Sequence, residues 1–199
     1  MFPLGTVLFP HALLPLHVFE PRYRELTEQA LAGTGEFGVV LIERGSEVGG
    51  GDTRFDVGTV ARIVEAGRLP DGRYVLTTVG THRLRVEEWL GEAPYPQADV
   101  VLVEEPPPAA AAGAARDAVE ARLRDLAKLL ARANDRPAPD DLTLAPDPGR
   151  ASFEGAAMAP IGPLDAQRLL EIDDPLTRLE RLAHLLAEEV DVLRRLADE

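Results

Sequence analysis

Hydrophobic and polar positions divide the chain into two parts with different periodicities. Up to about residue 104, short apolar or alternating runs are separated by turns that contain glycine and proline, a pattern typical of β-strands. Beyond that point, apolar residues recur at the spacing of one helix face, which indicates amphipathic helices. We therefore predict an α+β fold in which a small β-barrel with one early helix precedes a C-terminal helical bundle.

The first apolar segment, FPLGTVLFPHALLPLHVF at residues 2–19, contains three prolines and no charged side chain apart from two histidines. A membrane-spanning helix needs about 20 uninterrupted apolar residues, and proline removes helix hydrogen bonds. A secretory signal would need a basic region before the apolar run and a cleavage site of small residues after it. We predict two buried strands instead, Thr6–Phe9 and Ala12–Leu16, with Pro10 in the turn between them.

A helix is predicted directly after this segment, over FEPRYRELTEQALAG. Pro21 suits its first turn, where a backbone N–H has no intrahelical partner. Gly33 can adopt the left-handed conformation that ends many helices. Tyr23, Leu26 and Ala30 form its apolar stripe, so the helix should pack on a sheet and leave its charged side in water.

Several strands follow in the sequence, and two of them are expected to form a hairpin. LPDG at residues 69–72 combines a proline that fixes φ, an aspartate that binds nearby backbone and a glycine that accepts positive φ. The glycine-rich stretch GSEVGGGD is predicted to be a mobile loop. The predicted strands are FGVVLIE, VGTVARIVEAG, RYVLTTVGTHRLRVEEW and ADVVLVEE.

A stretch rich in proline and alanine, EEPPPAAAAGAA, is interpreted as a linker. We accordingly predict a barrel subdomain at residues 1–104, a linker at 105–115 and a helical subdomain at 116–199. In the helical subdomain, the first helix should bury an apolar face and end before the proline-rich loop that follows it. That face consists of Val119, Leu123, Leu126 and Leu130.

Three further helices complete the predicted bundle. Two short ones are expected over Ala151–Ala159 and Leu164–Ile172, the second beginning near Asp165. The last helix should begin with Asp174 as its N-cap and Pro175 at its first position, and run to about residue 197. Its apolar stripe consists of Leu176, Leu179, Leu182, Leu186, Val190 and Leu193.

Composition and charge narrow the possible functions. The chain has no cysteine, which excludes disulfides, thiolate metal sites and cysteine nucleophiles, and this suits a cytoplasmic protein. Its formal net charge is −13, and Lys128 is its single lysine. Nucleic-acid binders usually carry a concentrated basic face, so we predict no nucleic-acid partner, and no membrane partner either.

The residues FPLGTVLFPHALLPLHVFEPRYRELTEQAL, FGVVLI, GTVARI and LPDGRYVLTTVGTHRLRV together resemble the Lon N-terminal domain, the substrate-recognition domain of the Lon protease family. LLEIDDPLTRLERLAHLL is similar to the helical half that follows the barrel in that family. The resemblance implies a PUA-like β-barrel followed by a helical bundle. It further implies a region that engages substrate polypeptides, here in a stand-alone form without the ATPase and peptidase domains.

Residues for the family's enzymatic steps are missing from the sequence. A nucleotide-binding P-loop requires a G-x-x-x-x-G-K motif, which does not occur. A serine–lysine dyad needs a serine beside a lysine base, and only Ser46, Ser152 and Lys128 could supply one. Their positions in a loop, near a short helix and on a helical face make a dyad improbable. We therefore predict no catalytic residue and no cofactor.

Metal binding is also not expected. His11 and His17 lie close in sequence, but zinc needs three or four ligands, and packing in a turn or barrel explains them better. His82 and His184 stand alone and are interpreted as structural. The pairs Asp140–Asp141 and Asp173–Asp174 lack the oxygen spacing of a calcium loop and fit helix capping.

The segment FEPRYR could be interpreted as a catalytic acid with an anion clamp, or as a helix start. We favour the second, with Glu20 capping the helix N-terminus, where the macrodipole favours a carboxylate, and an arginine paired either with it or with a neighbouring loop. The outer face of this helix remains a candidate partner surface, with Arg22, Arg24, Glu25 and Glu28. The residues that define the structural motif are Pro10, Pro15, Phe19, Glu20, Pro21 and Tyr23.

The function that these observations favour is non-enzymatic binding of unfolded or exposed polypeptide segments. The chain could serve as a quality-control adaptor to a protease or chaperone. Most aromatic residues of the first part should lie in the core, and any exposed ones would form an apolar patch for such segments. The alternative is a binder of small molecules or nucleic acid on a PUA-like barrel, since a barrel does not fix function. The sequence leaves the natural client and the oligomeric state open.

Overall fold

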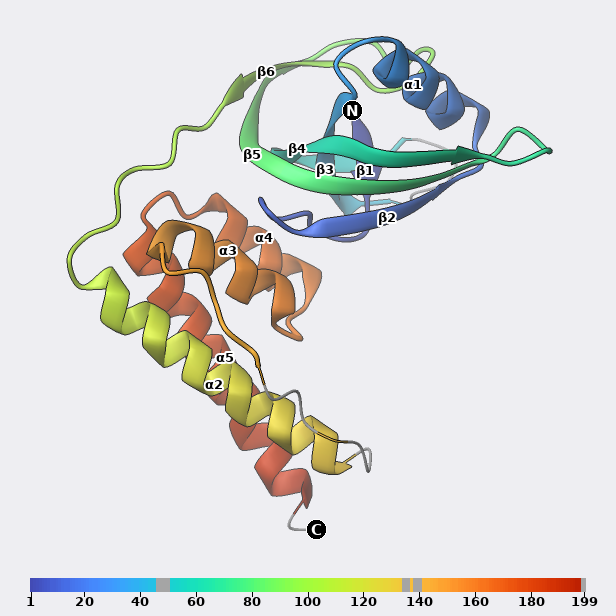
Figure 1. Ribbon diagram of the computed structural model, residues 1–199. Helices are drawn as coiled ribbons and strands as arrows, with labels where there is room; N and C mark the ends of the chain where they lie inside the picture. Colours follow the sequence, from blue (N-terminus) through green and yellow to red (C-terminus); the bar gives the residue numbers. More distant parts are fainter. Residues whose placement is uncertain (46–50, 134–136, 138–140, 198–199) are drawn as a thin grey trace. The chain divides into compact units, whose positions relative to one another are not determined.

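The computed structural model describes residues 1–45, 51–133, 137 and 141–197 (Figure 1). The chain divides into two compact units, Met1–Glu104 and Glu105–Glu199, which we call the sheet unit and the helical unit. The predicted glycine-rich loop falls largely on residues 46–50, which lie outside the described residues, as does Asp140.

The sheet unit contains a six-stranded mixed sheet and one helix. The strands follow the order β1-β3-β4-β5-β2, and β6 pairs with the second half of β5. The β1–β3 pair is parallel, and the other four pairs are antiparallel. The bounds are β1 Phe2–Leu4, β2 Leu13–Val18, α1 Pro21–Ala32, β3 Glu36–Arg44, β4 Thr53–Arg68, β5 Tyr74–Trp89 and β6 Ala98–Leu102.

The sheet curls into a half-barrel whose two ends are β1 and β2 (Figure 1). The β4–β5 ladder contains two register shifts, and such bulges bend and twist a strand pair. The predicted hairpin between these strands is confirmed, with Gly72 at a φ of 83° in the turn. The predicted α+β fold is also confirmed, with a half-barrel as its β part.

The strand predicted at Thr6–Phe9 is wrong, because β1 lies earlier, at Phe2–Leu4. β1 pairs with residues 39–41 of β3, a non-local parallel contact. The carbonyl of Leu8 accepts a hydrogen bond from a side chain, the Thr59 hydroxyl, at 2.6 Å. Residues 6–9 therefore form a loop segment whose second half, Leu8 and Phe9, is buried, and a side chain of β4 holds its backbone.

Helix α1 buries the predicted stripe of Tyr23, Leu26 and Ala30. The ring of Phe2 stacks on that of Tyr23, with centroids 4.2 Å apart, and this contact joins β1 to α1 in the core. The prediction for Gly33 is wrong: its φ is −110°. Gly35 takes the left-handed conformation instead, with a φ of 76°, and its N–H donates to the carbonyl of Ala30.

The helical unit consists of four helices in the described part of the chain. Its long helices α2 and α5 pack together along their apolar faces. Most of the predicted face of α2 is buried, but Leu130 is 38% exposed, because it lies close to the end of the helix. The bounds are α2 Ala112–Ala133, α3 Pro148–Met158, α4 Pro163–Glu171 and α5 Pro175–Ala197.

Capping residues set the starts of these helices. The predicted N-cap of α5 is confirmed, since the Asp174 carboxylate accepts from the N–H and the hydroxyl of Thr177 at 2.8 and 2.7 Å. Asp147 caps α3 by accepting from the N–H of Arg150. Helix α4 begins at Pro163 rather than near Asp165, because proline is favourable at the first helical position.

Part of the proline-rich loop before α3 is packed against α2. The Arg116 guanidinium donates to the carbonyl of Leu144 at 2.8 Å, and Glu120 accepts from the N–H of the same residue at 2.8 Å. Arg124 donates to the carbonyl of Leu142 at 2.9 Å. Charged side chains of α2 thus supply the hydrogen bonds that the backbone of this loop needs.

Candidate functional site

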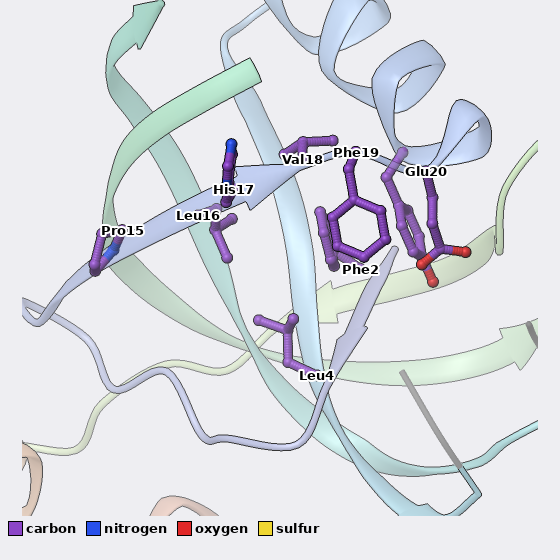
Figure 2. A pocket seen from close by; sticks show the side chains of 9 residues that line it. Phe2, Leu4, Pro15, Leu16, His17, Val18, Phe19 and Glu20 are labelled. Atoms are coloured by element: carbon purple, nitrogen blue, oxygen red, sulfur yellow. The ribbon is translucent and has the colours of Figure 1, made fainter. Parts of the chain in front are cut away.

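The sheet unit has a pocket where the two end strands of the half-barrel come together with α1. Its volume is about 160 Å³, which is enough for one apolar side chain but not for a large ligand. Figure 2 shows the lining side chains, which come from β1, from β2 and from the start of α1. They are Phe2, Leu4, Pro15, Leu16, His17, Val18, Phe19, Glu20 and Tyr23.

Strand β2 gives this pocket a buried wall and an exposed rim. Leu16 and Val18 are buried and belong to the core. The residues that alternate with Leu16 and Val18 point to the other face of the strand, and each of them is exposed. We call this exposed row, together with the pocket, the β2 site; the row consists of Leu13, Pro15 and His17 of β2 and of Phe19, which directly follows the strand.

Pro15 lies in the middle of β2, and the hydrogen-bond pattern explains how the strand tolerates it. The carbonyl of Ala12 accepts from the N–H of Gly80 on the β5 side. Because backbone groups alternate in direction along an antiparallel strand, the groups of Leu14 and Leu16 also face β5, and those of Pro15 face the free edge. The missing N–H of Pro15 therefore removes no bond from the β2–β5 ladder.

Phe19 is the exposed aromatic residue of the β2 site. Its side chain is 53% exposed, whereas Phe2 and Tyr23 are nearly buried. The sequence could not indicate which aromatic side chain would be accessible, because Phe19 ends a continuous apolar segment in which buried and exposed residues are not distinguished by residue type. Its position in the exposed row beside an apolar pocket makes Phe19 the best placed of the predicted motif residues to contact another molecule.

The polar end of the pocket is an ion pair above an aromatic ring. The Glu20 carboxylate accepts from Nε of Arg22 at 3.1 Å, and the Arg22 guanidinium lies over the Tyr23 ring, 4.5 Å from its centroid. The prediction that an arginine pairs with Glu20 is confirmed. Glu20 is also the N-cap residue of α1, although its side chain makes no capping hydrogen bond.

Burial gives Tyr23 an altered pKa with a measurable consequence. Desolvation raises the pKa of its hydroxyl from 10.0 to about 12. Between these values the folded state binds more protons than the unfolded chain, so the free energy of unfolding should decrease as the pH rises.

The variant Tyr23→Phe removes this titrating group. Between pH 9 and pH 11 its free energy of unfolding should therefore decrease by about 1 kcal/mol less than that of the wild type, as measured by urea unfolding. Equal losses in both proteins would contradict this assignment.

The other predicted partner residues on α1 differ in their surroundings. Glu28 accepts from the Tyr74 hydroxyl at 3.1 Å and lies 3.7 Å from Arg68. Arg24 is half-buried and lies against Gly72 of the hairpin turn. Glu25 is exposed and has a long contact of 3.5 Å with Gln29. Of the four side chains, Glu28 therefore joins α1 to β4 and β5, whereas the ion pair of Arg22 lies within the start of the helix.

The structure does not bring the candidate nucleophile and base together in the described region. The Ser152 hydroxyl donates to the carbonyl of Gly149 and accepts from Arg178. The Lys128 ammonium lies 4.0 Å from Asp125, and Ser46 lies outside the described residues. Where side chains are described, no three histidine, aspartate or glutamate residues could hold a metal ion.

A second hollow lies at the C-terminal end of α1. It measures about 440 Å³ and includes Leu26, Phe37 and Tyr95 in its lining. The Tyr95 hydroxyl donates to the side-chain carbonyl of Gln29. We consider the β2 site the better candidate because its pocket lies beside the exposed residues Leu13, Pro15, His17 and Phe19.

Among the helices of the described residues, none has both the length and the hydrophobicity needed to cross a bilayer.

Comparison with known proteins identifies a family. The family model for the "ATP-dependent protease La (LON) substrate-binding domain" matches residues 1–188. Lon protease 2 of Herpetosiphon aurantiacus is 30% identical over 96% of this chain, and Lon protease of Dictyoglomus thermophilum is 29% identical over 94%. The chain spans about a quarter of the length of these relatives, 23% and 24%.

Solved structures agree with this match. The Lon N-terminal domain protein from Xanthomonas campestris superposes with a TM-score of 0.67 and 27% identity, covering 91% of this chain and 94% of that one. The N-terminal domain of Mycobacterium avium complex Lon protease gives a TM-score of 0.65 at 20% identity over 93% of this chain and 96% of that one, which supports the fold. The family model and these similarities show that the chain belongs to the Lon substrate-binding domain family.

Proposed function

We propose that this protein is a non-enzymatic, cytoplasmic binder of unfolded or extended polypeptide segments, and that the β2 site holds an apolar side chain of such a segment. The observation that carries the proposal is a small pocket, lined mainly by apolar residues, beside an exposed row formed by β2 residues and Phe19. The family's description as a substrate-binding domain supports the same function. Bound clients would then be passed to a protease or chaperone, with this protein as the adaptor.

Binding is expected to occur through side chains rather than by addition of a strand to the sheet. The free edges of a sheet can accept a further strand, and β1 and β2 are the two end strands. Both contain a proline, Pro3 and Pro15, and proline on an edge strand hinders pairing with another chain. The pocket between these strands offers apolar contact instead.

Replacing Phe19 by alanine should weaken binding of an apolar, unstructured peptide about tenfold, because the rim of the pocket loses aromatic contact area. The measurement is fluorescence anisotropy with a labelled peptide that has phenylalanine and leucine at its centre. Binding by the wild type should also show a negative heat-capacity change.

Leu90→Ala is the matched control, since Leu90 is also an exposed apolar residue, at 47%. It follows the end of β5 at Trp89, whereas β2 pairs with the opposite end of β5, at residues 74–79. This variant should bind like the wild type. Equal affinities for Phe19→Ala and wild type, with both proteins folded by circular dichroism, would place the binding surface elsewhere. The outer face of α1, with Arg22, Arg24, Glu25 and Glu28, is then the next surface to replace.

A further inference from the structure

We infer that the polypeptide segments held at the β2 site carry positively charged residues beside their apolar anchor. This inference rests on the proposed function and adds the charge of the client to it. It follows from the distribution of charged groups over the sheet unit and around the pocket.

The sheet unit as a whole is acidic. Residues 1–104 contain 15 aspartates and glutamates, nine arginines and no lysine, which gives a formal charge of −6. A surface with this excess attracts cationic segments and repels anionic ones.

Most arginines of this unit are already balanced by carboxylates within it. Arg22 pairs with Glu20 beside the pocket, and Arg62 pairs with Glu36 at 3.0 Å. Arg54 is paired with Asp52 and also lies 2.9 Å from Glu92. Arg68 lies 3.7 Å from Glu28, and Arg73 lies 2.7 Å from Asp71. Acidic groups of a client would therefore have to compete with internal partners for these guanidinium groups.

Carboxylates lie on two sides of the β2 site. Glu20 lines the pocket at the start of α1, where it pairs with Arg22, so a cationic client group would share this carboxylate with that arginine. On the other side, Pro15 of β2 is paired with Thr77 of β5, which is paired with Glu65 of β4. Directly opposed residues in antiparallel strands point to the same face, so Glu65 lies on the exposed face about 10 Å from Pro15, two strand spacings away. Its side chain is exposed, and it can meet a lysine or arginine that flanks an anchor bound at the pocket.

The test uses three labelled peptides with one common phenylalanine–leucine centre, flanked by lysine, by serine or by glutamate. At about 0.1 M salt we expect the lysine-flanked peptide to bind roughly tenfold more tightly than the glutamate-flanked one, with the serine-flanked peptide between them. At about 1 M salt, where the screening length falls from about 10 Å to about 3 Å, the three affinities should converge.

Glu65→Gln should reduce the preference for lysine at low salt, and Glu20→Gln should do so as well if it stays folded. Glu87→Gln is the control, since Glu87 is exposed on β5 beyond the part of that strand that pairs with β2, and it should keep the full preference. If all three peptides bind equally at low salt, or if the glutamate-flanked peptide binds best, the inference is wrong and the proposed function stands. If no peptide binds at either salt concentration, the proposed function fails and the inference falls with it.

Discussion

Replacement of Gly58 by alanine is expected to destabilise the sheet unit by about 3 kcal/mol, the upper end of the usual cost of overpacking. A Cβ atom at this position would lie 2.2 Å from the carbonyl oxygen of Val39 and 2.7 Å from Cγ1 of Val40. Gly58 is buried and pairs directly with Val40 in the β3–β4 ladder. The carbonyl belongs to a paired strand, so the clash can be relieved only by separating β3 from β4.

Gly67→Ala provides the matched control in the same strand. A Cβ at Gly67 would meet only the carbonyl oxygen of Val75, at an ordinary distance of 3.9 Å, so this variant should be as stable as the wild type within about 0.5 kcal/mol. Trp89 is the single tryptophan of the chain and lies in β5, so its fluorescence reports on the sheet unit during urea unfolding. Equal unfolding midpoints for the two variants would show that β3 and β4 are not as close as the structure places them.

The elements that the sequence predicted correctly are those fixed by neighbouring residues. The hairpin at LPDG needs only its own turn residues, and the cap at Asp174 needs only Thr177, three positions away. The stripe of α1 follows from helical spacing alone. By contrast, β1 was misplaced because its position depends on parallel pairing with β3, and nothing in residues 2–9 specifies which of them meet that strand. A parallel partner leaves no turn signal in the sequence.

Some residues that line the candidate site could be singled out from the sequence for the same reason, although as a structural motif and not as a binding site. Pro15, Phe19, Glu20 and Tyr23 stood out as motif residues because they lie in one continuous segment. Phe2 and Leu4 did not, since they reach the pocket only after β1 has joined the far end of the sheet.

A charged residue that becomes buried is hard to recognise in a sequence, and Arg178 is the clearest case. It lies on α5 among several other charged residues, where solvent exposure is the usual expectation. In the structure its side chain is completely buried. A periodic pattern that assigns charged residues to the solvent side of a helix would place it wrongly.

Arg178 connects three segments of the helical unit. Its guanidinium donates to the carbonyl of Ile172 at 2.6 and 3.1 Å and to the Ser152 hydroxyl at 2.7 Å. The group also lies 3.8 Å from the centroid of the Phe153 ring and 3.2 Å from the Glu105 carboxylate. It therefore joins α3, the turn before α5 and the first residue of the unit in one network.

Arg178→Met should destabilise the helical unit by about 3 kcal/mol, because it leaves buried acceptors without a donor and removes the cation from the Phe153 ring. Arg178→Lys should recover only part of this loss, since an ammonium cannot reproduce the planar set of donors that contacts Ile172 and Ser152 together.

Arg181→Met is the control on the same helix. Arg181 is 41% exposed and lies 3.9 Å from Asp165, so its replacement should change the free energy of unfolding by less than about 0.5 kcal/mol. Urea unfolding followed by far-ultraviolet circular dichroism measures all three variants. If Arg178→Met unfolds at the same urea concentration as Arg181→Met, the buried network adds nothing to stability and the helices are held by their apolar faces alone.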